Sequence, residues 1–340
     1  MKNRLAILAI ALVFAVPAIA APKATLLVVT KQTHALSLVD TDTLKVVAQV
    51  PIGEDPHEVV ILPDNKTAYV SHFGEGTLKT LAVVDLVNAK ALPDISIAPL
   101  QGPHGFALRS NTLWMTADKS KALFAMDIKT GEITGLLGTG QDRTHMLWAN
   151  DDTTKIIASN AVSGTMSIFD ARSDAPILAP GAPPAPASYT SPGYKHTLVP
   201  TGRLAEGFAV SPDAKEVWVG DADGKIHIID LTSNAERESF DAGTIGANRL
   251  AYTPDGKYVM VTQKRGKDLV VIDAKTHAVA YRVPIEENGA SGIQMQPDGS
   301  RVFIACPRDH FVAVVDLKKM KRIATIDAGR EPDGLGWWVH

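Results

Sequence analysis

The sequence has little cysteine and no excess of charge of either sign. Cys306 is the only cysteine in 340 residues, so no disulfide can form within the chain. Its place in the apolar run 301–306 predicts a buried thiol rather than a nucleophile. The formal net charge of -3 gives no electrostatic basis for binding nucleic acid. We therefore expect neither a disulfide scaffold nor a nucleic-acid-binding protein.

Several catalytic and cofactor-binding motifs are also missing. The chain contains no Gly-x-Ser-x-Gly elbow, no His-Glu-x-x-His motif, no Walker loop and no Cys-x-x-Cys-His haem attachment site. These absences exclude the hydrolases, nucleotide-binding proteins and cytochromes that depend on those motifs. Any functional site has to be sought in other features of the chain.

The first 20 residues differ in character from the rest. Lys2 and Arg4 precede an apolar stretch from Leu5 to Val16, and 18–20 (Ala-Ile-Ala) is a small-residue cleavage site. This pattern predicts a secretory signal peptide over residues 1–20. No other segment has the length and polarity of a membrane span. We expect the mature chain, residues 21–340, to be an exported protein without a membrane span, located in the periplasm or secreted.

A hydrophobic tetrad that ends in aspartate recurs seven times. The aspartates lie 42 to 45 residues apart, except for one interval of 60 residues. They are Asp40, Asp85, Asp127, Asp170, Asp230, Asp273 and Asp316. A period in the low forties, built from β-branched runs and turn residues, is typical of a β-propeller with one four-stranded blade per repeat. Because the aspartates recur in every repeat, we interpret them as turn residues and not as catalytic groups.

Each repeat also carries a hairpin turn followed by a β-branched or aromatic strand. The sixth repeat reads Pro-Asp-Gly-Lys at 254–257, then Tyr258-Val259, then the tetrad 270–273. This pattern resembles the YVTN-type β-propeller repeat family of exported proteins, and the resemblance covers essentially the whole mature chain. It implies an all-β, seven-bladed β-propeller with four antiparallel strands per blade. Since the chain ends on a lone first strand at 332–338, we expect one C-terminal and three N-terminal strands to close the ring.

One insertion interrupts the period and accounts for the interval of 60 residues. Residues 174–202 contain seven prolines, and such a stretch cannot pair as a central strand. We expect an extended loop between the third and fourth strands of its blade within a single propeller domain. The loop is either an inert spacer or a lid or partner-docking segment.

Aligning the repeats places one residue per blade at the entry to the inner strand. The residues are His57, His104, His145, Glu206, Asn248, Ser291 and Asp333. We call these the ring residues, since a propeller would set them around the mouth of its central channel. Three imidazoles with a carboxylate or water suit Zn²⁺, Cu²⁺ or Ni²⁺, and a small anionic ligand is the other candidate. The structural alternative is that each histidine only hydrogen-bonds the backbone of a neighbouring blade.

A second set of polar residues lies where the second strands end. His72, Asn160 and Asp221, together with Asp333, are candidates for an outer shell that orients the ring histidines. The alternative is that they cap strand ends. The basic cluster 264–267 we interpret as a solvated turn.

Two classes of function remain from the sequence. The first is a monomeric, non-catalytic binding or scaffold protein that takes a small ligand or a protein partner at the channel mouth. The second is a metal-dependent hydrolase or lyase, as similarity to lactonase and streptogramin-lyase propellers implies. Its ion would be held by the three histidines, and Glu206 or Asp333 would act as general base. An electron-transfer partner is a third, weaker option. We favour binding, because Asn248 and Ser291 are neutral and no carboxylate-dense ion cage is present.

Overall fold

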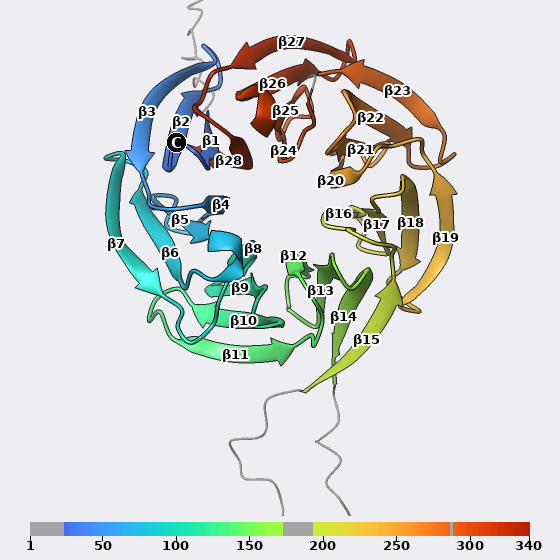
Figure 1. Cartoon of the computed structure of the whole chain (residues 1–340), viewed down its shortest axis with the longest axis horizontal. Coiled ribbons are helices and arrows are strands. Elements are labelled where there is room, and N and C mark those ends of the chain that lie inside the picture. The colour runs from blue at the N-terminus through green and yellow to red at the C-terminus, as the bar shows by residue number, and fades with distance from the viewer. Residues whose placement is uncertain (1–23, 173–192, 286–287) are drawn as a thin grey trace, which may run out of the picture.

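The computed structural model describes residues 24–172, 193–285 and 288–340. Within these ranges the chain forms seven four-stranded antiparallel sheets, arranged as blades around a central axis (Figure 1). The helices in these ranges are two short 3-10 turns, η1 (Gly74–Gly76) and η3 (Pro307–Asp309). Neither turn is long and apolar enough to cross a membrane. The predicted all-β, seven-bladed propeller is confirmed.

We number the blades 1 to 7 and give their strands from the axis outward. Blade 1 contains β4 (Pro56–Ile61), β5 (Thr67–His72), β6 (Thr80–Asp85) and β7 (Lys90–Ser96). Blade 2 contains β8 (Pro103–Arg109), β9 (Thr112–Ala117), β10 (Ala122–Asp127) and β11 (Ile133–Gly138). Blade 3 contains β12 (Thr144–Ala149), β13 (Lys155–Asn160), β14 (Thr165–Ala171) and β15 (Tyr194–Pro200). Blade 4 contains β16 (Phe208–Val210), β17 (Glu216–Gly220), β18 (Lys225–Asp230) and β19 (Ala235–Asp241).

The remaining blades complete the ring. Blade 5 contains β20 (Ala247–Tyr252), β21 (Tyr258–Gln263), β22 (Asp268–Asp273) and β23 (Val279–Pro284). Blade 6 contains β24 (Ile293–Met295), β25 (Arg301–Cys306), β26 (Phe311–Asp316) and β27 (Lys321–Ile326). Blade 7 contains β28 (Pro332–Val339), β1 (Ala24–Thr30), β2 (Ala35–Asp40) and β3 (Lys45–Pro51).

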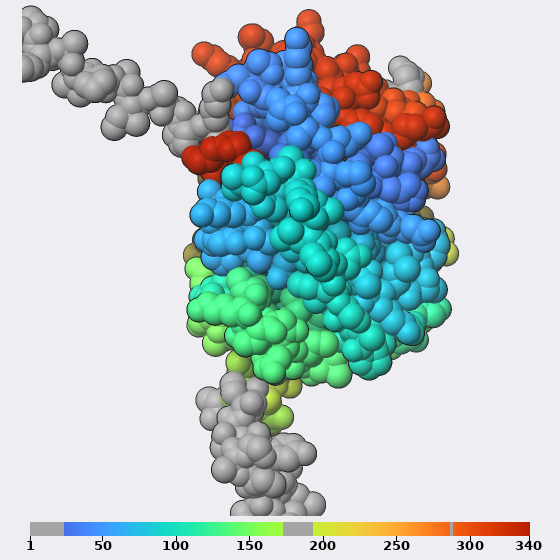
Figure 2. Space-filling view, turned by 90° about the vertical axis from the view of Figure 1, so that its left-hand side faces the viewer, coloured from blue at the N-terminus to red at the C-terminus, as the bar shows by residue number. Residues whose placement is uncertain are grey.

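The two ends of the described chain meet in blade 7. The C-terminal strand β28 pairs antiparallel with β1, with Leu26 opposite Trp337. In the side view, C-terminal residues (red) lie beside N-terminal residues (blue) where the ring closes (Figure 2). The predicted closure by one C-terminal and three N-terminal strands is confirmed, and it removes the free sheet edge that an open array would leave at its axis.

The core lies between the blades, because strand residues alternate between the two faces of each sheet. Along β1, Leu27 and Val29 pack toward blade 1, while Leu26 and Val28 pack against blade 6. Cys306 is fully buried between blades 5 and 6, as its apolar context predicts. The second and third strands of each blade are therefore buried along nearly their whole length, whereas the fourth strands are mostly exposed.

Six of the seven tetrad aspartates act as turn residues, while Asp170 accepts hydrogen bonds from the side chains of Lys155 and Asn234. Asp40 Oδ1 accepts hydrogen bonds from the backbone N–H groups of Asp42 (2.9 Å) and Thr43 (2.8 Å), which closes the turn between β2 and β3. Equivalent bonds occur at 85, 127, 230, 273 and 316. These six aspartates therefore set the hairpins on the face opposite the ring residues.

The predicted signal peptide and most of the predicted proline-rich loop lie outside the described residues. The part of the insertion that the structure describes, 193–202, includes β15, the fourth strand of blade 3. The predicted loop range was therefore too long at its C-terminal end. Residues 194–200 read Tyr-Lys-His-Thr-Leu-Val-Pro, and this β-branched segment pairs along the edge of β14.

Candidate ligand-binding site

Hydroxyl groups on the second strands fix the entries to the inner strands. The backbone N–H of Gly105 donates to Thr116 Oγ1 (2.9 Å), and this hydroxyl donates to the carbonyl oxygen of His145 in the next blade (2.8 Å). Two further hydroxyls make the same pair of bonds. Ser159 Oγ accepts from the backbone N–H of Met146 and donates to the carbonyl oxygen of Glu206. Thr262 Oγ1 accepts from the backbone N–H of Arg249 and donates to the carbonyl oxygen of Ser291. Each bridge ties a blade to the ring residue of the next blade, so neighbouring ring side chains are held at a set spacing.

The three predicted histidines form a row along one side of the channel mouth. Nδ1 of His57 lies 3.1 Å from Nε2 of His104, and the ring centroids of His104 and His145 are 3.8 Å apart. His104 and His145 are only 1% and 3% exposed. Burial, reinforced by nearby positive groups that include Arg249 and Arg143, holds the pKa of both imidazoles well below its usual value. We therefore expect His104 and His145 to be neutral at pH 7.

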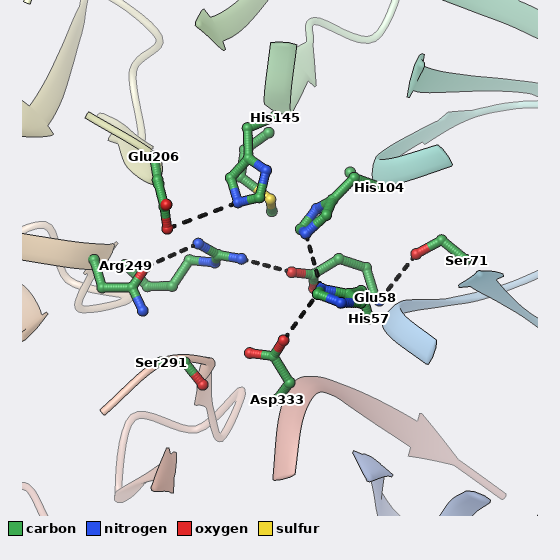
Figure 3. Close-up of polar contacts among 12 residues, drawn as sticks. His57, Glu58, Ser71, His104, His145, Glu206, Arg249, Ser291 and Asp333 are labelled. Carbon is green, nitrogen blue, oxygen red and sulfur yellow. Dashed lines mark hydrogen bonds and ion pairs between the residues drawn. The ribbon is translucent and has the colours of Figure 1, made fainter. Parts of the chain in front are cut away.

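The imidazoles do not converge on one point. His104 directs a nitrogen at His57, and Nε2 of His145 lies 3.8 Å from Glu206 Oε2 (Figure 3). In the part of the chain that the structure describes, no group of three or more His, Cys, Asp or Glu side chains is placed to hold a metal ion. The residues present do not fit the predicted Zn²⁺, Cu²⁺ or Ni²⁺ site, because the nitrogens face each other and a carboxylate instead of a shared centre.

Asp333 extends the row beyond His57. Its Oδ2 lies 3.3 Å from Lys31 Nζ and 3.4 Å from His57 Nδ1, while Asp55 Oδ1 lies 3.0 Å from His57 Nε2. Burial alone would raise the pKa of Asp333, but Lys31, His57 and Arg249 outweigh it and lower this pKa to about 2. Asp333 was predicted both as a ring residue and as a member of the outer shell, and the structure places it in the ring, where it lies beside Lys31 and His57.

Glu206 is buried and is held by cations from two other blades. Its Oε1 accepts a hydrogen bond from Lys264 Nζ (2.6 Å) and lies 3.1 Å from Nη2 of Arg143. Burial alone would raise its pKa, but Lys264 and Arg143 outweigh burial, so the pKa of Glu206 is lowered. The interpretation of 264–267 as only a solvated turn is therefore wrong for Lys264, whose long side chain extends from the loop into the site.

An arginine crosses the channel beneath the ring. Arg249 from blade 5 donates through Nη2 to Glu58 Oε1 in blade 1 at 2.8 Å, and through Nη1 to Asn248 Oδ1 at 3.1 Å. Figure 3 shows its guanidinium between Glu206 and Glu58, surrounded by ring side chains. Burial alone would lower the pKa of Arg249, but the carboxylates of Glu58, Asp333 and Glu206 raise it. Arg249 is thus a permanent cation at the centre of the site.

A cavity of about 270 Å³ lies at the channel mouth. Its lining includes all seven ring residues, so the structure brings together every position that the repeat alignment placed at an inner-strand entry. The cationic side chains that line it are Lys31, Arg143, Arg249, Lys264 and Arg308, against the carboxylates Glu206, Glu331 and Asp333. Positive charge is therefore in excess on the cavity wall.

The Arg249–Glu58 pair divides the channel. Both residues line a second cavity of about 210 Å³, which they share with apolar side chains such as Phe208, Ile293 and Leu335. The polar mouth is thereby separated from an apolar interior. Sequence reasoning missed this pair, although a signal was present. Glu58 and Arg249 directly follow ring residues, at a position where four other blades have glycine.

Three residues predicted for the outer shell cap strand ends. His72 Nδ1 lies 2.9 Å from Thr80 Oγ1, and Asn160 Oδ1 accepts a hydrogen bond from Thr144 Oγ1 (3.0 Å), the residue before His145. Asp221 Oδ1 accepts from the backbone N–H groups at 223 and 225 and closes its own turn. Of the three, Asn160 comes nearest to the predicted role, since it holds the segment that leads into a ring histidine.

Asp118 lies in a groove beside the mouth, which it shares with Arg143. Burial raises the pKa of Asp118 to about 6, in spite of Arg143 and Lys119 nearby. The ordinary pKa of this carboxyl group is 3.8. At pH 7.5 the group is ionised in both states, but ionising it costs more free energy in the folded state than in the unfolded chain. The raised pKa therefore lowers the stability of the fold at this pH. The cost shrinks as the pH falls toward 3.8, and it is absent well below that value, where the group is protonated in both states.

We therefore expect Asp118→Asn to raise the free energy of unfolding by about 1 kcal/mol at pH 7.5 and by much less at pH 4. Urea titrations at the two pH values measure this difference. Asp42→Asn, at an exposed turn position, serves as the control and is expected to show no such gain. A gain that is the same at both pH values would contradict the assignment.

No protein-family profile matches the chain. The chain is similar to "Uncharacterized protein YncE" from Salmonella typhimurium and from Salmonella typhi, with 21% identity over 231 residues in each case. The match covers 66% of this chain and 62% of each relative, so it spans less than two thirds of their length. It supports a distant relationship to that protein.

Two solved structures resemble the fold. Hydrazine synthase from Kuenenia stuttgartiensis aligns with a TM-score of 0.64 and 16% identity, over 82% of this chain and 88% of that one. A functionally unknown protein from Desulfotomaculum acetoxidans aligns with a TM-score of 0.71 and 13% identity, over 92% and 98%. At these identities the likeness concerns the fold alone.

Proposed function

We propose that this protein is an exported, non-catalytic binding propeller that takes a small anionic molecule into its channel mouth. The observation that carries the proposal is the cavity of about 270 Å³, whose wall holds five cationic side chains against three carboxylates. The low pKa of His104 and His145 supports it, because nearby cations contribute to that shift. An anion would be attracted by the same positive potential.

The size of the cavity favours a small molecule. Ligand pockets commonly have volumes of about 300–1,000 Å³, so a cavity of about 270 Å³ suits a compact ligand better than a protein segment. The Arg249–Glu58 pair closes its inner end with a charged guanidinium. Arg143 and Lys264 are partly exposed at the outer end, with 36% and 45% of their side chains accessible, so an entering anion meets them first.

The carboxylates of the site are better suited to holding cations than to removing protons. Glu206 and Asp333, the candidate general bases, both have lowered pKa values and both contact lysine. A general base works best when its pKa is near the working pH. With imidazoles that do not fit a metal ion, this favours binding over the alternative metal-dependent hydrolase or lyase.

Export and repeat family belong to the same proposal. The positive start, apolar stretch and Ala-Ile-Ala site at residues 1–20 support secretion to the periplasm or the medium. The Pro-Asp-Gly-Lys turns and Asp-ended tetrads support membership of the YVTN-type repeat family. Cell fractionation with the wild-type leader and with a leaderless chain tests export directly.

Binding is tested by isothermal titration calorimetry at low ionic strength, with sulfate, malonate and citrate as probes and malonamide as a neutral comparison. We expect the anions, and not malonamide, to bind with a 1:1 stoichiometry. Lys264→Met should weaken binding about tenfold or more, because it removes a charge-assisted contact. Glu206→Gln should strengthen binding, because it releases Lys264 and Arg143 from an internal competitor.

The matched control is Lys215→Met, which removes a lysine of 76% side-chain exposure that pairs with Asp213 outside the site. It should leave anion affinity unchanged. If none of the anions binds to the wild type, the proposal is wrong. It is also wrong if dialysed protein retains stoichiometric zinc, copper or nickel that the triple variant His57→Ala/His104→Ala/His145→Ala lacks, since that result points to a metal site.

A further inference from the structure

The histidine row contains polar atoms that the protein itself leaves without partners. Nδ1 of His104 and Nδ1 of His145 are buried, and no hydrogen-bond partner lies within reach among the described residues. More than nine tenths of buried polar groups in proteins are hydrogen-bonded, so two neighbouring unpaired imidazole nitrogens are exceptional. Both residues line the cavity at the channel mouth. The row therefore offers hydrogen-bonding capacity next to the proposed anion site.

Only one end of this pair of imidazoles has a carboxylate beside it. Nε2 of His145 lies 3.8 Å from Glu206 Oε2, whereas Nε2 of His104 faces Nδ1 of His57 at 3.1 Å. A proton added to His145 would be compensated by Glu206, while a proton added to His104 would lie between two other imidazoles. His145 is thus the more favourable place for an additional positive charge.

In the empty site, the groups around His145 oppose that charge. Arg143 precedes it in the loop before β12, Arg249 extends from β20, Lys264 follows β21, and His57 comes from β4, while His104 from β8 is neutral. Glu206, from the loop before β16, is the facing carboxylate, and it is already shared by Arg143 and Lys264. Glu58 pairs with Arg249, so three cations are met by two carboxylates, and cations still outnumber anions around the imidazole as long as no ligand is bound.

We propose that the anion binds together with a proton, which His145 takes up from solvent as the anion enters the cavity. This inference rests on the proposed anion-binding function and adds its regulation by pH. The only bond formed is N–H on the imidazole, and the proton comes from water or buffer. The anion reverses the local excess of positive charge, and the imidazolium can donate a hydrogen bond to one of its oxygens.

The coupling has a definite direction. Since the bound state holds the extra proton more tightly, affinity rises as the pH falls, by up to about tenfold per pH unit. As the pH falls, the affinity begins to rise near the pKa that His145 has in the complex. The rise ends near the pKa of His145 in the free protein, which lies well below the usual value of 6.5. The site would therefore load its ligand in mildly acidic surroundings and release it at higher pH.

The experiment is calorimetric titration of the protein with sulfate, which does not titrate in this range, from pH 5 to pH 8. Pairs of buffers with different ionisation enthalpies give the number of protons taken up per sulfate bound. We expect up to about one proton for the wild type and none for His145→Gln. His34→Gln, at an exposed histidine outside the cavity lining, should keep the uptake.

The outcomes separate the two proposals. If the wild type binds sulfate and the pair of buffers shows no proton uptake, this inference is overturned and the binding function stays intact. Persistent uptake by His145→Gln would also overturn it, because another group would then carry the proton. Failure of sulfate, malonate and citrate to bind at any pH would instead overturn the proposed function. The wild-type buffer pair decides the coupling even if a histidine variant does not fold.

Discussion

Arg249→Met is expected to lower the free energy of unfolding by about 3–5 kcal/mol, because it leaves Glu58 as an uncompensated charge in the channel. Arg249 and Glu58 are 2.8 Å apart, and their side chains are only 10% and 15% exposed. Burial already raises the pKa of Glu58 even with Arg249 present. Removing the guanidinium would leave a carboxylate that must either stay charged in a poorly solvated place or take up a proton.

The double variant Glu58→Met/Arg249→Met should recover most of this loss, since apolar residues of similar size often replace a buried ion pair at little cost. Urea unfolding, followed by both tryptophan fluorescence and circular dichroism, measures the single variants and the double variant as a cycle. Arg237→Met is the matched control. Its ion pair with Glu216 joins side chains that are 47% and 19% exposed, so a loss of about 1 kcal/mol or less is expected. If Arg249→Met were no worse than Arg237→Met, the channel pair would not stabilise the ring.

The fold could be predicted from the sequence because its determinants are local and repeated. Each tetrad and each Pro-Asp turn specifies a strand and a hairpin within about ten residues, and seven tetrads at a nearly regular period, broken by one insertion, determine the number of blades. The same register predicted the ring. Equivalent positions in a symmetric array occupy equivalent places, so all seven ring residues line one cavity.

The chemistry inside the ring could not be predicted in the same way. Glu58 and Arg249 are 191 residues apart and meet only because the closed ring sets blades 1 and 5 on opposite sides of one channel. Lys264 reaches Glu206 from a loop of another blade, which no repeat register encodes. Register also leaves the rotamers of the histidines open, and their rotamers decide between a shared metal centre and a hydrogen-bonded row.

Glycines show how tightly the inner strands approach at the level of the ring. Four ring residues are followed by glycine, and at each one a Cβ atom would meet the carbonyl oxygen of the next ring residue. The distances are 2.8 Å at Gly105, 2.3 Å at Gly207, 2.0 Å at Gly292 and 2.2 Å at Gly334. Real Cβ atoms essentially never lie within 3.0 Å of a backbone atom, so adjacent blades pack here without room for one methyl group.

Gly292→Ala is expected to cost about 3 kcal/mol or more, because the new methyl group would lie 2.0 Å from the carbonyl oxygen of Asp333. That oxygen is backbone and cannot rotate away, so blades 6 and 7 must separate at the channel mouth. Asp333 holds Lys31 and His57, and their displacement should also weaken sulfate binding. Gly138→Ala at the end of β11 is the control, since nothing lies within 4 Å of its Cβ position, and its stability should change by less than about 1 kcal/mol. Urea unfolding and sulfate titration of both variants measure the contrast. Equal stability of the two would mean that the ring tolerates a wider spacing between its inner strands, and the hydroxyl bridges alone would then have to set the positions of the ring residues.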